Sequence, residues 1–211
     1  RSACSPGLRR RRCRARRGGL LNLLSVVLLW FYSTSFKKQL LVGNVIISLL
    51  TAWVVLVQYV CETHLRLLNM PPPQVGYQSA VFKAAVLYGG FAFVISLIRE
   101  VVKDMEDMEG DARYHCRTMP IVWGIPASKS FVYTWMLVLA ASILIVTVYT
   151  LQIHWWWMTL YLLVAVILPL VQVFRIFGKT SGPPGFAAVS RLIKGIMLTG
   201  ILSMLFFKIY L

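Results

Sequence analysis

The sequence predicts an all-α, multi-span transmembrane helix bundle. Hydrophobic residues make up 58% of the 211 residues and charged residues only 14%, whereas a soluble domain is nearer half apolar and a quarter charged. The apolar residues stand in uncharged runs long enough to cross a bilayer, which takes about 20 residues of helix. We therefore expect an integral membrane protein whose surroundings are the lipid bilayer, with no nucleic-acid partner.

The first three spans are predicted at Leu20–Phe36, Gln39–Val60 and Tyr77–Ile98. Each run is almost free of charge, and each is bounded by basic or polar residues. Between the second and third spans, Cys61–Gly76 is predicted to be a loop. Three consecutive prolines at 71–73 exclude a helix through that stretch, because proline lacks the backbone donor and clashes with the preceding turn.

Three further spans follow the polar segment Arg99–Lys129. Ser130–Phe174 contains no Asp, Glu, Lys or Arg over 45 residues, which is the length of two spans with a turn at residues 152–154. Three tryptophans at 155–157 are typical of a membrane-interface belt. Arg175–Arg191, rich in glycine and proline, is predicted to be a polar loop, and Leu192–Leu211 to be the sixth span.

The first 19 residues form a separate Arg-rich tail, ahead of a membrane domain at residues 20–211. Eight arginines and no acids in this tail suit a transit peptide, a basic tail that binds nucleic acid or lipid, or a segment foreign to the gene. Without the tail, eleven basic residues fall on the membrane face that carries the acidic segment and three on the other. The positive-inside rule makes the acidic face cytoplasmic, and the tail would then lie on the opposite side.

Six of the seven carboxylates of the chain lie within Glu100–Asp111. In a helix that turns about 100° per residue, Glu100, Asp104, Asp107 and Asp111 fall within an arc of roughly 60°. One interpretation is a solvated charge run. The other is a Mg²⁺ site, because this ion is usually held by one or two carboxylates together with phosphates and waters, and ionisable groups in membrane bundles are usually functional.

Cations surround the acidic segment on the same face, namely Lys37, Lys38, Arg99, Lys103, Arg113 and Arg117. Carboxylates that hold Mg²⁺ beside cations that hold phosphate oxygens are suited to a diphosphate, whose departure they assist by stabilising negative charge. An apolar chain on that diphosphate can lie among the helices. The pattern therefore favours an isoprenyl diphosphate donor and a hydrophobic acceptor.

Two motifs together resemble the UbiA superfamily of membrane prenyltransferases. Residues 103–111, with the pattern K-D-x-E-D-x-x-G-D, followed by Thr118-Met119-Pro120, are similar to the family's second aspartate-rich motif. Residues 31–38, FYSTSFKK, followed by Gly43-Asn44, resemble its YS-x-x-LKR element. The detailed form is most similar to the branch of geranylgeranylglycerol-phosphate geranylgeranyltransferases.

The resemblance implies a nine-helix bundle, of which the six spans here correspond to the last six. It implies Mg²⁺-dependent transfer of a prenyl group from its diphosphate to a lipid-like acceptor such as geranylgeranylglyceryl phosphate. By position, Asp104, Asp107 and Asp111 would be the catalytic, metal-binding acids. The substrate-binding residues would be Lys37 and Lys103 at the diphosphate, with Tyr32 and Arg99 close by.

The sequence departs from the family pattern in two places. The first aspartate-rich motif, N-D-x-x-D-x-x-x-D, is absent, since no acid precedes Glu62. We therefore expect the chain as given to be impaired. His115 stands where relatives usually have glycine after the Asp-x-x-Tyr run. Three alternatives stay open: prenylation of an aromatic acceptor of the quinone, homogentisate or chlorophyll type, a transport protein with an acidic mouth, and a non-catalytic membrane scaffold.

Overall fold

The computed structural model describes residues 41–69 and 75–206, with isolated positions at 23, 26, 27 and 30. Every regular element within these ranges is helical, which confirms the predicted all-α class. Five helical segments among the described residues are long and apolar enough to cross a membrane. The predicted span at residues 20–36 lies almost wholly outside the described residues.

The chain divides into two compact units, which are described separately. Within the described residues, the first unit holds Ile46–Phe93, and the second holds the remainder of Lys38–Val45 together with Val94–Leu211. Each of the two long helices, α2 (Val42–Asn69) and α3 (Val75–Glu106), has residues in both units.

In the first unit, α2 and α3 approach closely at a glycine. A Cβ built on Gly89 would lie 3.7 Å from the carbonyl oxygen of Ala52, and the rings of Tyr59 and Phe82 lie 5.6 Å apart. Small residues permit such approach in membrane bundles, where packing rather than the hydrophobic effect holds helices together. A Cβ built on the next residue, Gly90, would have nothing within 4 Å.

The loop predicted at residues 61–76 is wrong over its first half. Helix α2 continues through the polar residues that follow the apolar run and ends only at Asn69. Charged and polar residues do not stop a helix, because their side chains cost little helical propensity. The helix ends at Asn69, ahead of the three prolines, and residues 70–74 of the predicted loop lie outside the described residues.

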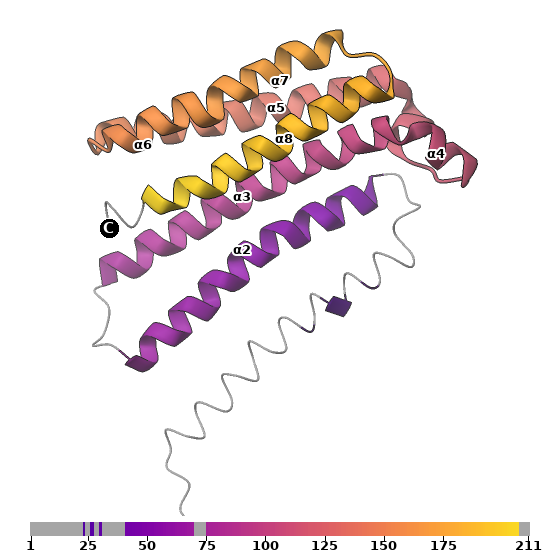
Figure 1. The fold of residues 1–211 in the computed structure, drawn as a ribbon. Coiled ribbons are helices and arrows are strands. Elements are labelled where there is room, and N and C mark those ends of the chain that lie inside the picture. The colour runs from indigo at the N-terminus through magenta and orange to yellow at the C-terminus, as the bar shows by residue number, and fades with distance from the viewer. Residues whose placement is uncertain (1–22, 24–25, 28–29, 31–40, 70–74, 207–211) are drawn as a thin grey trace, which may run out of the picture. The chain divides into compact units, whose positions relative to one another are not determined.

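The second unit contains the remaining elements: α4 (Met108–Arg113), α5 (Met119–Gln152), α6 (Trp156–Tyr161), the π-helical η2 (Leu162–Ile167), α7 (Leu168–Lys179), α8 (Pro183–Leu202) and η3 (Ser203–Phe206). The predicted turn at 152–154 is confirmed. After it, α6, η2 and α7 form one rod beside α5, and α8 returns along that rod (Figure 1).

The loop predicted at residues 175–191 is also wrong. Helix α7 runs to Lys179 and α8 begins at Pro183, so only residues 180–182 leave the helices. Gly182 has φ +81°, a conformation that glycine adopts without steric cost. Two prolines then occupy the first positions of α8, where a missing N–H costs nothing.

A lysine secures this turn against α5. Lys129 Nζ donates to the carbonyl oxygen of Thr180 at 2.7 Å, where the free carbonyls at the end of α7 attract a positive charge. The ammonium also lies 5.8 Å and 5.9 Å from the ring centres of Phe177 and Phe186, which are 0% and 1% exposed. Lys129 therefore fixes the register of α5 against the α7–α8 turn.

A second set of polar contacts fixes α8 against the rod. Pro169 cannot donate to the carbonyl of Ala165, four residues earlier, and the hydroxyl of Thr199 donates to that carbonyl at 2.9 Å instead. Tyr161 in turn donates to the carbonyl of Thr199 at 2.8 Å. Interhelical hydrogen bonds of this kind stabilise the packing of membrane helices. They matter because an apolar helix face gains little free energy when it moves from lipid into contact with another helix.

Candidate functional site

The acidic segment is helical rather than a loop. Helix α3 continues through Glu106 and α4 begins at Met108, with a bend at Asp107 (φ −90°, ψ 6°). Backbone hydrogen bonds of 2.9 Å from Asp107 N to Lys103 O and from Asp111 N to Asp107 O carry the helical spacing across the bend. The three aspartates thus keep the spacing on which the one-face prediction depends.

The acids lie at the edge of the core of the second unit. Val101 and Val102 are fully buried and Met105 is 2% exposed. Beside them Asp104 is half-buried, while Asp107 on the bend is exposed. The segment therefore passes from packed core to open surface within one turn of helix, which is where a polar headgroup and an apolar tail could meet.

Asn44 holds the most buried of the three aspartates. Its Nδ2 donates to Oδ2 of Asp104 at 2.6 Å, and Asn44 itself is 7% exposed. The contact joins positions 60 residues apart in the second unit. Asn44 was part of the motif described above but was not among the predicted site residues. The available signal was a side-chain amide at the start of an apolar helix, where a buried polar group needs a partner.

Asp104 lies in a strongly negative field. Glu100, Asp107 and Asp111 are all close enough to disfavour charge on its carboxylate. The hydrogen bond from the Asn44 amide acts against that repulsion. A cation placed among these carboxylates would relieve it, which fits the electrostatic requirement of a metal site.

The donor set fits Mg²⁺ only with help from a substrate. Among the described residues, no three His, Cys, Asp or Glu side chains come close enough to hold a metal ion. Mg²⁺ is usually bound by one or two protein carboxylates, with phosphate oxygens and waters completing its six ligands. Asp104 and its neighbours could supply that small share, provided that a diphosphate supplies the rest.

The predicted cations have different surroundings. Arg99 forms an ion pair with the neighbouring Glu100, so its guanidinium is already engaged. Lys103 is exposed, as are Arg113 on α4 and Arg117 after it. Tyr32 and Lys37 lie outside the described residues. The exposed cations are therefore the ones that can reach a diphosphate without breaking an ion pair.

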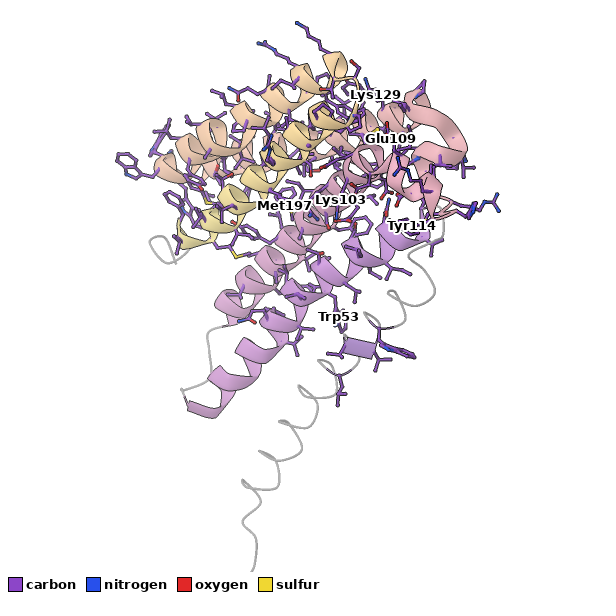
Figure 2. All side chains as sticks on the ribbon, turned by 45° about the vertical axis from the view of Figure 1, so that its right-hand side comes forward. Trp53, Lys103, Glu109, Tyr114, Lys129 and Met197 are labelled. Carbon is purple, nitrogen blue, oxygen red and sulfur yellow. The ribbon has the colours of Figure 1, made fainter. Side chains whose placement is uncertain are left out.

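A tight turn joins the acidic segment to α5. Cys116 N donates to the carbonyl of Asp111 at 3.0 Å, and His115 has φ +55°. This left-handed conformation suits the glycine that relatives usually carry here, and histidine tolerates it better than most residues. Glu109, Tyr114 and Lys129 lie at the same end of the second unit (Figure 2).

The start of α5 is redirected immediately after this turn. Gly124 has φ +81° and ψ 164°, which interrupts the helix, and Pro126 follows. Such a backbone is essentially restricted to glycine. The hydroxyl of Ser128 donates to the carbonyl of Gly124 at 3.0 Å and so satisfies a group that the interruption exposes.

Known proteins with similar sequences are synthases of one kind. A relative from Methanothermobacter thermautotrophicus named digeranylgeranylglyceryl phosphate synthase is 33% identical over 120 residues, covering 57% of this chain and 37% of the relative. A relative of the same name from Methanocaldococcus jannaschii is 29% identical over 169 residues, covering 80% of this chain and 52% of the relative. The chain thus spans between about a third and a half of these relatives. No solved structure gives a significant match.

A family-wide comparison covers most of the chain. The profile described as the UbiA prenyltransferase family matches residues 18–198. That range takes in both motifs of the sequence, the acidic segment, the first four apolar helices and most of the fifth. The chain belongs to the UbiA prenyltransferase family.

Proposed function

We propose that this chain takes part in transferring a prenyl group from an isoprenyl diphosphate to a phosphate-bearing lipid acceptor, such as geranylgeranylglyceryl phosphate. The observation that carries the proposal is the set of carboxylates around Asp104, placed at the buried end of α3 beside the exposed cations Lys103, Arg113 and Arg117. The names of the relatives support a phosphate-bearing lipid over an aromatic acceptor.

Each part of the site has a chemical task in this proposal. Asp104, Asp107 and Asp111 would supply one or two carboxylates to Mg²⁺, with oxygens of the diphosphate among its other ligands, and Asn44 fixes the orientation of Asp104. Bound Mg²⁺ would neutralise charge on the diphosphate and make it a better leaving group. Lys103 supplies positive charge beside the aspartates. Lys37, which lies outside the described residues, is expected to supply a second positive charge to the diphosphate.

The transfer exchanges one bond at the prenyl group. The bond from its first carbon to the diphosphate oxygen breaks, an acceptor oxygen bonds to that carbon, and the acceptor's proton is released. The half-buried setting of Asp104 keeps the reacting end near the core, where fixed charges act more strongly than in bulk water. The apolar helices accommodate the prenyl chain. We place this face of the bundle on the cytoplasmic side, from the distribution of basic residues.

This sequence supplies only the second of the family's two aspartate-rich motifs. A single set of acids can bind a Mg²⁺–diphosphate complex, but it holds fewer of the oxygens on which charge develops. We therefore expect weak, Mg²⁺-dependent donor binding by this chain and little or no turnover.

Binding of radiolabelled geranylgeranyl diphosphate to the purified chain, with and without Mg²⁺, tests the proposal. We expect Mg²⁺ to strengthen binding and Asp107→Ala to remove that dependence. Glu109→Ala is the matched control, because Glu109 is an exposed acid of the same segment that points away from the aspartate face. If Asp107→Ala and Glu109→Ala weaken binding equally, general charge rather than a site is responsible, and the proposal fails.

A further inference from the structure

Two cations lie on the outer face of α8, deep within a helix that is apolar enough to span a membrane. Arg191 and Lys194 are both exposed, whereas Ser190 and Ile193, which directly precede them, are buried. They stand at i and i+3, so their Cβ atoms lie about 5–6 Å apart on one side of the helix. Two like charges at this spacing repel each other unless an anion lies between them.

The register of the helices gives the depth of these cations. The rings of Phe177 and Phe186 are 6.2 Å apart, and α8 runs antiparallel to α7. Lys194 lies eight residues after Phe186 and is therefore level with residue 169, eight residues before Phe177. The hydrogen bonds of Thr199 to the rod at residues 161–165 give the same register.

Residue 169 lies close to the middle of the span Trp156–Lys179. At about 1.5 Å per residue, Lys194 is some 20 Å from Trp156 and about 15 Å from Lys179. A lysine this far into a span is costly and usually marks a binding site or an ion path. Arg191 is one turn nearer to the α7–α8 turn, where Arg175 and Lys179 are exposed.

No acid of this part of the chain can neutralise the pair. Residues 112–211 contain no Asp or Glu. Among the residues that the structure describes, neither Arg191 nor Lys194 has a carboxylate within ion-pair distance. The counter-charge must therefore come from outside α5–α8.

The same face of α8 continues as an apolar track. Leu198, Ile201 and Leu205 are 60%, 60% and 63% exposed. With Arg191 and Lys194 they lie within an arc of about 80° on the helix. Side chains on a helix lean toward its N-terminus, so both charged heads point toward the α7–α8 turn and away from this track. The face is cationic at one end and apolar along the rest.

We propose that this face of α8 binds an anionic phospholipid, with Arg191 and Lys194 holding the phosphate and the hydrocarbon chain lying along Leu198, Ile201 and Leu205. Basic pockets between membrane helices bind anionic lipid headgroups, and the guanidinium can hold a phosphate through two hydrogen bonds. The proposal does not depend on the proposed transferase activity.

Native mass spectrometry of the purified full chain with phosphatidylglycerol and phosphatidylcholine tests the site. We expect one retained phosphatidylglycerol, preferred by about tenfold. Arg191→Leu/Lys194→Met should abolish the preference, and these apolar residues suit a lipid-facing helix. Arg191→Lys/Lys194→Arg keeps both charges and should keep it.

The matched control is Arg175→Gln/Lys179→Gln, which removes two exposed cations from the end of the neighbouring helix. Retention of most of the lipid preference by this control supports a specific site. An equal loss would assign the preference to general surface charge and overturn the proposal. Binding of inorganic phosphate as tight as that of the lipid would also overturn it, because the apolar track would then contribute nothing. Unchanged helical circular dichroism excludes misfolding as the cause of a loss.

Discussion

The two ends of α5 share a backbone feature but carry opposite chemistry. At its N-terminal end the turn contains His115 with φ +55°, and at its C-terminal end the turn contains His154 with φ +58°. The first turn follows six carboxylates and several arginines and lysines. The second leads into three tryptophans, with no Asp, Glu, Lys or Arg from residue 130 to 174.

The polar groups at the two ends are also satisfied differently. At the C-terminal end, the hydroxyls of Thr150 and Thr159 lie 2.9 Å apart and bond each other. At the N-terminal end, Asp104 has a neutral amide partner inside a negative field. The two turns thus share a left-handed histidine, and the surrounding side chains decide which end of α5 can bind a charged ligand.

The largest effect is expected from exchanging the partners of the Asn44–Asp104 contact. Asp104→Asn should weaken Mg²⁺-dependent binding of isoprenyl diphosphate by about 100-fold, the upper end of the losses seen when metal-site partners are changed. The combined variant Asn44→Asp/Asp104→Asn keeps an amide–carboxylate hydrogen bond but moves the charge by one side chain. We expect it to keep thermal stability but not to recover binding.

The exchange separates a structural role from a functional one. Titration calorimetry with and without Mg²⁺ gives the affinity, and thermal unfolding in micelles gives the stability. Recovery of binding in the double variant would mean that the hydrogen bond alone matters. The contrast between the two ends of α5 would then be one of packing rather than of ligand binding.

An intermediate effect is expected at the α7–α8 turn, which Lys129 joins to the N-terminal part of α5. A Cβ at Gly185 would lie 2.6 Å from Cγ2 of Thr180. Thr180 cannot easily turn away, because its hydroxyl donates to the carbonyl of Ile176 at 2.8 Å and its carbonyl accepts from Lys129. Gly185→Ala should therefore lower the free energy of unfolding by about 1–3 kcal/mol.

Two further variants check the cause of this loss. Gly195→Ala places a methyl group where nothing lies within 4 Å, so it should be neutral or stabilise the helix by about 0.5–1 kcal/mol. Thr180→Ser in the Gly185→Ala background removes the clashing methyl group, keeps the hydroxyl and should restore stability. Equilibrium unfolding in mixed micelles, followed by circular dichroism, measures all three variants. A loss that Thr180→Ser does not repair would mean that another contact is disturbed.

The sequence predicted element types better than element ends. The loops predicted at residues 61–76 and 175–191 are too long, because α2 continues to Asn69 and α7 to Lys179. Helices end where the backbone requires it, as at Gly182 and the two prolines after it. Uncharged runs show where a chain can lie in lipid, and they say little about how far each helix extends into water.

The candidate site was predictable only in its local part. The spacing of Asp104, Asp107 and Asp111 on one helix is a property of neighbouring residues, and helical hydrogen bonds connect that segment. The contacts of Asn44 with Asp104 and of Lys129 with Thr180 join residues 60 and 51 apart. Such pairs depend on how helices pack, which a single sequence does not specify. In the sequence, Lys129 cannot be told apart from the other cations of the polar segment, whereas in the structure it fixes the α7–α8 turn.

The smallest effect is expected from replacing the two left-handed histidines by glycine. A non-glycine residue in this conformation costs about 1–2 kcal/mol, which glycine avoids. Glycine also makes the unfolded chain more flexible, so part of this stabilisation is lost as conformational entropy on folding. His115→Gly should thus raise the free energy of unfolding by up to about 1 kcal/mol. His154→Gly should raise it less, because His154 also lies 6.0 Å from the ring of Trp156. Unfolding in mixed micelles measures both, and donor binding should be unchanged by either. If His115→Gly weakens Mg²⁺-dependent binding while His154→Gly does not, the imidazole of His115 acts at the site, and the two turns differ in more than the residues around them.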